Sequence, residues 1–286
     1  MACDLHTHTN HSDGAYSPRE LVRAAKELNL TIALTDHNTV TGLPEFLSEA
    51  ERLGVNAISG IELSTVYEGK EFHLIGLFID EEHYDTIENM CASYMVKKEQ
   101  SNIDLVNKLC DMGYVMDFNE IKKKNVKGHV NRAHIAAELV AKGYVESIGV
   151  AFKTLLEEDV GLYIPPERFA LVDAIRFLRK IDAVSILAHP LKDLTPDRLR
   201  QILPELINAG LDGMETMHSS YSDEIINISK KIAKEFNLLE SGGSDFHGGN
   251  KPGVNLGVGK GNINISDDIF DKILQRRNQI ISEKTE

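Results

Sequence analysis

Histidine and carboxylate side chains recur in short motifs along the chain, and both are side chains that bind divalent metal ions. The sequence begins with the motif His6-Thr7-His8, and Asp245-Phe246-His247 lies near its other end. In each motif the two possible ligands are two residues apart, which on an extended strand aims both side chains to the same side. Each motif can therefore chelate one ion, and together they predict a metal site built from distant parts of the chain.

Seven apolar runs predict the strands that would position these side chains. We expect the strands at residues 2–9, 31–37, 56–63, 71–78, 183–190, 213–218 and 238–247. Helical patterns lie between most of them, and two of these begin with the capping signals Ser17-Pro18 and Thr195-Pro196. Strands that alternate with helices predict a parallel sheet, and this number of units favours closure into an α/β barrel.

The regular alternation stops after residue 78 and resumes near residue 183. The interval contains a long amphipathic helical pattern at residues 85–112 and two shorter ones at 131–142 and 172–180. We therefore expect a barrel whose first part covers residues 1–98 and whose second part covers residues 169–286. Residues 99–168 would form a helical insertion, carried on a loop of the barrel as a substrate cap.

The possible metal ligands fall on the expected strands, mostly at their carboxyl ends. In strand order they are His6 and His8, Asp36 and His37, Glu62, His73, His189, Glu215 and His218, and Asp245 and His247. Because parallel α/β barrels build their active sites at the C-terminal ends of the strands, we expect one multinuclear centre there. We expect His11, His83 and His129 to lie outside this centre, with His83 exposed.

The composition limits the class of protein. The chain has 286 residues and a net charge of −13, with no basic block, so general affinity for duplex nucleic acid is not expected. No apolar run approaches the length of a membrane helix, the N-terminus lacks signal-peptide features, and the three cysteines are widely spaced. We therefore expect a cytoplasmic protein, in which bound metal would supply the positive charge for an anionic substrate.

Several ordered motifs resemble those of the PHP (polymerase and histidinol phosphatase) superfamily. They are Asp4-Leu5-His6-Thr7-His8-Thr9 with Ser12-Asp13-Gly14, Thr35-Asp36-His37, Gly60-Ile61-Glu62, Leu187-Ala188-His189-Pro190 and Ser244-Asp245-Phe246-His247. The resemblance covers the whole chain and is to the stand-alone metal-dependent phosphoesterases that act on nucleotides and small phosphorylated sugars. It implies a distorted, TIM-like (β/α)7 barrel with a helical insertion after the fourth strand, and a trinuclear centre of Mn²⁺, or alternatively Zn²⁺ or Fe²⁺.

The family pattern, carried over residue by residue, implies nine metal ligands. They are His6, His8, Glu62 and Asp245 around one ion, with Glu62 bridging to a second ion held also by His73 and His189, and Asp13, His37 and His247 around a third. Three divalent ions outweigh three carboxylates, so an acidic protein would gain a phosphate site. The resemblance implies hydrolysis by a metal-bound hydroxide at this centre.

Substrate contacts are expected from two further segments. Asn131-Arg132-Ala133-His134 resembles the Arg-x-His element of this branch, which implies that Arg132 and His134 bind substrate phosphate. His218, at the end of a strand, is expected to protonate the leaving group or contact phosphate. Members of the branch often carry a histidine slightly later, where this chain has Tyr221, so the identity of the general acid stays open.

The leading function is hydrolysis of a phosphate ester in a small nucleotide or phosphorylated sugar. Candidate substrates are nucleoside 3′,5′-bisphosphates, mononucleotides and ribose cyclic phosphates, with short single-stranded oligonucleotides as a further option and neither duplex nucleic acid nor membrane as a partner. Histidinol phosphate phosphatase is the specific alternative within the superfamily. The alternatives from other classes are an amidohydrolase acting on a C–N bond and a non-catalytic metal-binding accessory module.

Overall fold

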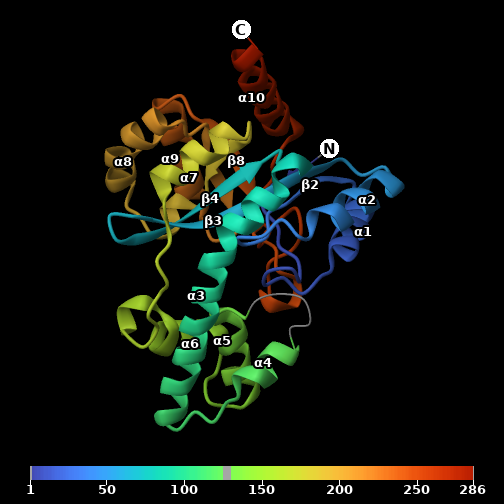
Figure 1. The fold of residues 1–286 in the computed structure, drawn as a ribbon. Helices are drawn as coiled ribbons and strands as arrows, with labels where there is room; N and C mark the ends of the chain where they lie inside the picture. Colours follow the sequence, from blue (N-terminus) through green and yellow to red (C-terminus); the bar gives the residue numbers. More distant parts are fainter. Residues whose placement is uncertain (1, 125–129, 286) are drawn as a thin grey trace.

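Within the described residues, eight strands form one sheet, and seven of them wind into an almost closed barrel (Figure 1). A computed structural model describes residues 2–124 and 130–285. Around the barrel the strands are β1 (Ala2–Asp4), β2 (Leu30–Leu34), β3 (Ala57–Tyr67), β4 (Lys70–Leu77), β6 (Val184–Leu187), β7 (Gly213–His218) and β8 (Leu239–Gly243). The barrel closes where the Leu5 N–H donates to Gly242 O at 3.2 Å and the Asp245 N–H donates to His6 O at 2.9 Å. The expected α/β barrel is thus confirmed.

Strand β4 departs from the expected parallel arrangement, because it runs antiparallel to both β3 and β6. It forms a hairpin with β3 through Glu68 and Gly69, which both have positive φ (49° and 76°). The two-residue link is too short for the crossover that parallel strands require. As a result, the first half of β4, which carries Glu71 and His73, reaches the end of the barrel where its neighbours have their carboxyl ends.

Helices cover the outside of the barrel and one of its mouths. The outer helices are α1 (Pro18–Leu28), α2 (Leu43–Leu53), α7 (Leu171–Lys180), α8 (Pro196–Ala209) and α9 (Asp223–Glu235). The expected caps are present: Ser17 Oγ accepts from the Glu20 N–H and Thr195 Oγ1 from the Arg198 N–H. Helix α10 (Asp267–Thr285) packs Phe270 and Ile273 into the apolar cluster that fills the barrel.

The long helix α3 (Tyr84–Asp111) leads out of the barrel into a second group of helices (Figure 1). These are α4 (Phe118–Lys124), α5 (Arg132–Ala141), α6 (Ile148–Ala151) and a π-helical turn (Phe152–Leu156). They share an apolar cluster of their own, to which α3 contributes Leu105 and Leu109. The short strand β5 (Phe169–Ala170) pairs with β3 and returns the chain to the barrel. We propose that this group, residues 99–168, is a substrate cap.

None of the helices in the described ranges combines the length and the apolar character that a membrane crossing requires.

Asp4 fastens the first strand to the segment that follows the last one. Its side chain is fully buried, and Oδ1 accepts from the Ser244 N–H at 2.8 Å. Oδ2 accepts from Ser244 Oγ at 2.5 Å and from the Gly257 N–H at 2.8 Å. This carboxylate therefore supports the closure of the barrel directly beside His6 and Asp245.

We expect Asp4→Ala to lower the free energy of unfolding by about 2 to 5 kcal/mol, since each buried donor left without a partner costs about 1 to 3 kcal/mol. Urea unfolding of the metal-free protein measures this loss. Asp173→Ala, which removes an exposed aspartate of α7, is the control and should change stability by less than about 0.5 kcal/mol. A loss below about 1 kcal/mol for Asp4→Ala would show that the closure does not depend on this carboxylate.

Candidate metal centre

Glu62 lies at the centre of a buried cluster at the carboxyl end of the barrel strands. Its side chain is 1% exposed, and its two oxygens face different groups of imidazoles. Oε2 lies 3.2 Å from His6 Nε2, 3.3 Å from His8 Nε2 and 3.0 Å from His37 Nδ1. Oε1 lies 2.9 Å from His73 Nδ1 and 3.3 Å from His189 Nε2. One carboxylate is therefore placed to bridge two positions for a cation.

Two aspartates extend the cluster toward the loops that follow β1 and β8. Asp245 Oδ1 lies 3.3 Å from His8 Nε2 and 3.3 Å from His247 Nδ1. Asp13 Oδ1 lies 3.1 Å from His247 Nε2, and Asp13 Oδ2 lies 3.8 Å from His37 Nε2. Asp13 and His247 thus form a third group beside the two that Glu62 joins.

The local backbone is fitted to this cluster. A Cβ atom on Gly243 would lie 2.2 Å from the Cβ of His6, so only glycine lets the end of β8 approach β1 this closely. His189 and Asp245 both have positive φ, at 30° and 55°. Such conformations are costly for residues with side chains and persist where the surrounding structure fixes them, often at functional sites.

Asp36, which the sequence offered as a possible ligand, supports the neighbouring loop instead. One of its oxygens accepts from the Thr9 N–H at 2.7 Å and from Ser12 Oγ at 2.5 Å. The other accepts from Thr9 Oγ1 at 2.5 Å. Because both oxygens are engaged, Asp36 holds the loop that carries Asp13 at the edge of the cluster.

The donor atoms fit divalent metal ions. The possible ligand atoms form four groups, and within each group the atoms all lie within 4.8 Å of one another. Together the groups contain all nine predicted ligand residues: His6, His8, Asp13, His37, Glu62, His73, His189, Asp245 and His247. Several of these atoms are buried and have no hydrogen-bond partner: His6 Nε2, both ring nitrogens of His8, His37 Nδ1, Glu62 Oε2 and His73 Nδ1. Buried polar atoms normally have partners, so their convergence on one place indicates a site that binds cations.

The charges of the cluster couple metal binding to proton release. Burial lowers the pKa of His8, but its contacts with Asp245 and Glu62 raise that pKa to about 9. Burial also lowers the pKa of His73, but its contacts with Glu62 and Glu71 raise that pKa to about 9. Burial lowers the pKa of His37 to about 3. Metal ligation needs neutral imidazoles, so ions that bind near neutral pH displace protons from His8 and His73.

Glu215, another possible ligand from the sequence, lies behind the cluster. Its Oε1 lies 3.0 Å from His6 Nδ1, and its Oε2 accepts from the His189 N–H at 2.7 Å. A carboxylate on one ring nitrogen fixes the proton there and leaves the other nitrogen free to bind metal. The structure therefore places Glu215 where it orients His6, with Nε2 facing Glu62.

His218 and Lys251 share the outer oxygen of Asp245. His218 is fully buried, with Nε2 3.1 Å from Asp245 Oδ2 and Nδ1 2.7 Å from Ser220 Oγ. Lys251 Nζ contacts the same Oδ2, and its side chain is 34% exposed. Tyr221 is buried, and its hydroxyl accepts from the Leu191 N–H at 2.8 Å. Lys251, which the motifs did not single out, is thus the more accessible of the two groups on Asp245.

The insertion reaches the cluster through the start of α5. Asn131 Nδ2 donates to Asp13 Oδ2 at 2.8 Å, and its side-chain oxygen caps the helix. His134 is buried, and its Nδ1 accepts from the Asn131 N–H at 3.2 Å. Arg132 contacts Glu71 and Glu158 and lies over the ring of Tyr163 at 4.5 Å. The predicted substrate residues of the insertion therefore stand beside the metal cluster, with Arg132 paired to carboxylates.

The remaining histidines contribute nothing to the cluster in the described part of the chain. His11 Nδ1 contacts Thr41 Oγ1 at 2.9 Å, away from the predicted ligands. His83 was expected to be exposed but is half-buried, with Nε2 3.5 Å from Glu82 Oε1. His129 lies outside the described residues.

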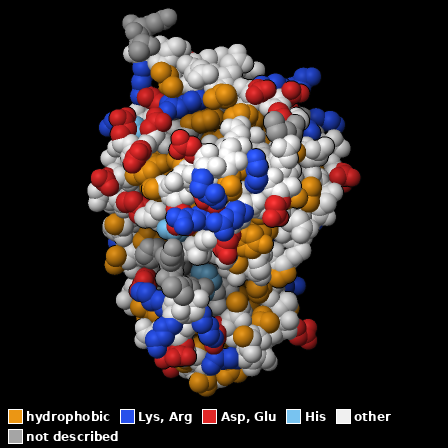
Figure 2. All heavy atoms as spheres, turned by 90° about the vertical axis from the view of Figure 1, so that its right-hand side faces the viewer, with side chains coloured by type: hydrophobic (Ala, Val, Ile, Leu, Met, Phe, Trp, Pro, Cys, Tyr) orange, Lys and Arg blue, Asp and Glu red, His pale blue; other side chains and the backbone are white. Residues whose placement is uncertain are grey.

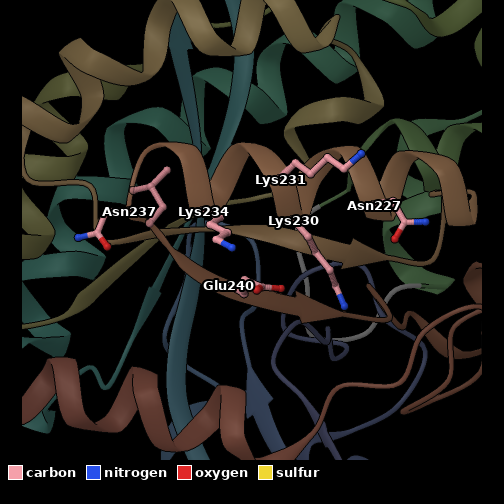
Figure 3. Close-up of a pocket in the computed structure, with 7 residues that line it drawn as sticks. Asn227, Lys230, Lys231, Lys234, Asn237 and Glu240 are labelled. Atoms are coloured by element: carbon pink, nitrogen blue, oxygen red, sulfur yellow. The ribbon is translucent and has the colours of Figure 1, made fainter.

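The candidate metal centre and the pocket beside α9 lie in different parts of the molecule. Figure 2 shows histidine side chains that reach the surface between the barrel and the insertion, close to lysine and arginine side chains. A separate pocket of about 440 Å³ is lined by Lys230, Lys234 and Glu240, among others (Figure 3). It lies beside α9 and the start of β8, whereas Asp245 follows the end of that strand. This pocket is therefore separate from the candidate metal centre.

Comparison with known proteins gives matches along most of the chain. A family model described as the PHP domain matches residues 4–164. A 5′-3′ exoribonuclease of Haemophilus influenzae is 33% identical over 246 residues, covering 85% of this chain and 89% of the relative. A phosphoribosyl 1,2-cyclic phosphate 1,2-diphosphodiesterase of Eggerthella lenta is 27% identical, covering 87% and 95%. A 3′,5′-nucleoside bisphosphate phosphatase of Chromobacterium violaceum is 27% identical, covering 89% and 90%.

Two solved structures share the fold over 96% of this chain. One, from Bifidobacterium adolescentis, is named as a proposed metal-dependent phosphoesterase and matches with a TM-score of 0.82 at 28% identity, covering 96% of that chain. The other, from Chromobacterium violaceum, is named as an amidohydrolase with bound sulfate and no metal. It matches with a TM-score of 0.85 at 25% identity, covering 97% of that chain.

Replacement of Glu62 by glutamine tests whether this carboxylate bridges metal ions. The amide keeps the shape but loses the charge, so we expect metal content after Mn²⁺ loading and desalting to fall by more than half. Activity should fall by more than the roughly 10- to 100-fold that is typical of changes to residues behind the ligands. The control is Glu49→Gln, a buried glutamate of α2 that pairs with Arg23 and Arg52. Full metal content in Glu62→Gln would remove Glu62 from the bridging role.

Proposed function

Because the chain belongs to the PHP domain family and is a metal-dependent phosphoesterase, we propose that it hydrolyses phosphate esters of small nucleotides at the cluster around Glu62. The proposed ligands are the nine clustered residues, and the proposed cofactors are three Mn²⁺ ions, with Zn²⁺ or Fe²⁺ as alternatives. When bound, such ions activate water, polarise the phosphoryl oxygens and stabilise the leaving oxygen.

One observation carries this proposal: both oxygens of Glu62 face imidazoles, three on one side and two on the other. A bridging carboxylate is the group that holds two cations close together. Two neighbouring cations can stabilise the attacking and the leaving oxygen of one phosphoryl transfer. The cluster therefore suits a phosphate ester better than a neutral amide.

The insertion supplies a second attachment point for an anion. Arg132 is 19% exposed, and its NH2 lies 3.4 Å from Glu71 Oε2 and 3.6 Å from Glu158 Oε1. Neither contact is short, so a phosphate can compete for the guanidinium, which binds phosphate through two parallel N–H groups. His134, in the same helix turn, would assist. A substrate with two phosphates could then bind the metal centre and Arg132 together.

These two attachment points favour a nucleoside 3′,5′-bisphosphate, or the 5′ end of a short single-stranded RNA, as the substrate. The relatives from Chromobacterium violaceum and Haemophilus influenzae are named for those two kinds of substrate. A ribose cyclic phosphate, for which the Eggerthella lenta relative is named, offers one phosphate to the metal centre. The net charge of −13 opposes binding of a long duplex polyanion.

Two groups can serve the leaving oxygen. We propose that Lys251, at the rim, contacts the ester oxygen directly, because its ammonium is accessible and already lies on Asp245. His218 remains the alternative proton donor, but it is fully buried between Asp245 and Ser220. Its proposed role is therefore to hold the Asp245 carboxylate toward His8.

A screen for released phosphate and nucleotide tests the substrate class. With Mn²⁺ added, we expect nucleoside 3′,5′-bisphosphates and short 5′-phosphorylated RNA to give the highest kcat/KM. Mononucleotides, a ribose cyclic phosphate, histidinol phosphate and an amide substrate form the comparison panel. A preference of about tenfold or more for histidinol phosphate or the amide would overturn the proposal, since it corresponds to about 1.4 kcal/mol in transition-state binding.

We expect Arg132→Ala to lower kcat/KM on the best substrate by roughly 10- to 150-fold, because it removes a charge-assisted hydrogen bond worth about 1.5 to 3 kcal/mol. Metal content should stay at the wild-type level. Arg132→Lys should recover only part of the loss, since an ammonium lacks the planar fork. Wild-type kinetics for Arg132→Ala, within about twofold, would show that Arg132 does not bind substrate.

A further inference from the structure

The two ring nitrogens of His73 face two different carboxylates. Nδ1 lies 2.9 Å from Glu62 Oε1, inside the metal cluster, and Nε2 lies 3.4 Å from Glu71 Oε1. Glu71 is two residues before His73 on β4, so both side chains lie on the same face of the strand. A neutral imidazole carries one proton, and a carboxylate beside one nitrogen keeps the proton there. The lone pair of Nδ1, which faces Glu62, would then be available to hold a metal ion.

Two arginines hold the Glu71 carboxylate. Arg168 places Nε 3.2 Å from Oε1 and NH2 3.0 Å from Oε2, so one guanidinium contacts both oxygens of the carboxylate. Arg132 NH2 lies farther away, 3.4 Å from Oε2. The Arg168 side chain is only 6% exposed, against 19% for Arg132. Arg168 is therefore the fixed support of Glu71, and Glu71 keeps that support when Arg132 turns to a substrate.

Both arginines belong to the segment that forms the insertion and its return to the barrel. Arg132 begins α5, donates to Leu156 O at 3.2 Å and lies over Tyr163. Arg168 immediately precedes β5, where Phe169 pairs with Thr65 of β3, and it also contacts Glu158. A continuous series of polar contacts thus runs from the insertion through Glu71 to His73.

The geometry points to Glu71 as a positioning residue that orients His73 for metal binding and links the metal centre to the insertion through Arg168. This inference rests on the metal centre proposed above and adds a residue outside its ligand set. In this proposal Glu71 contacts neither the substrate nor the metal ions, because it acts through His73. Its effect is to select which nitrogen of His73 carries the proton.

Calorimetric titration of the metal-free protein with Mn²⁺ tests this role without any substrate. Glu71→Gln keeps the size of the side chain, but its amide N–H can donate to His73 and favour the wrong tautomer. We expect at least one Mn²⁺ site to weaken by about 10- to 100-fold, as is typical when the partner of a metal-binding histidine is replaced. Arg168→Lys should weaken the same site less, because it keeps the charge but loses the fork.

The matched control is Glu158→Gln. Glu158 contacts the same two arginines but does not contact His73, so Mn²⁺ affinity should stay within about twofold of wild type. Equal losses in both glutamine variants would overturn the inference, as would an unchanged affinity in Glu71→Gln. If Glu71→Gln does not fold, Glu71→Asp replaces it, since aspartate keeps the charge but withdraws the carboxylate by one methylene. Wild-type Mn²⁺ affinity in Glu71→Asp would also overturn the role.

Nuclear magnetic resonance gives a readout that a merely structural role would not change. In the Zn²⁺-loaded protein with ¹⁵N-labelled histidine, we expect His73 to carry its proton on Nε2, and Glu71→Gln to lose that signature. A proton on Nδ1 in the wild type would overturn the inference. Failure of the wild type to bind any metal would instead reject the proposed metal centre, which separates the two proposals.

Discussion

Burial of the Glu62 carboxylate among five imidazoles is the constraint on which this structure depends. A lone carboxylate at 1% exposure would be strongly disfavoured, so the groups around it must compensate its charge. The imidazoles come from the segments that follow β1, β2 and β6, and from β4 itself. Closure of the sheet is what brings these distant segments together. Asp4 and Gly243 support that closure, and Asp36 holds the loop that carries Asp13.

The supporting residues form an outer layer of carboxylates around the cluster. Glu215 contacts His6 and Glu71 contacts His73. Asp245, itself a proposed ligand, presents one oxygen to the cluster and the other to His218 and Lys251. In the proposed site, each of these contacts leaves one atom of a ligand facing the cluster. The proposed ligands thus supply the atoms that would bind metal, while Glu215 and Glu71 behind them orient the rings of His6 and His73.

Much of this arrangement could be predicted from the sequence, because the evidence was local. The spacing in His6-Thr7-His8 and Asp245-Phe246-His247, together with the apolar runs, predicted the barrel, and the ordered motifs identified the family. The reversal of β4 was missed, since an apolar run is the same in either chain direction. Its signal was the short Glu68-Gly69 link, which leaves no room for a crossover helix.

Most of the contacts that were missed connect residues far apart in sequence. Arg168 contacts Glu71 across 97 residues of sequence and belongs to none of the motifs. Lys251 is only six residues after Asp245, but it too lies outside the motifs. Glu215 was expected as a possible ligand because it lies near the end of β7, but a bulge between Glu215 and Met217 alters the alternation of that strand. Such long-range pairings become visible only when the barrel is closed.

Helix α3 joins the barrel to the insertion without a break over 28 residues. Its first half is anchored in the barrel core by Ile87 and Cys91, and its second half is anchored in the insertion by Leu105 and Leu109. A helix turns by about 100° and rises about 1.5 Å per residue. The number of residues in α3 therefore sets the rotation of the insertion relative to the barrel. One residue added between the two anchors would swing Asn131 and Arg132 away from the metal cluster. Insertions and deletions should therefore be tolerated far less in this helix than substitutions on its exposed face.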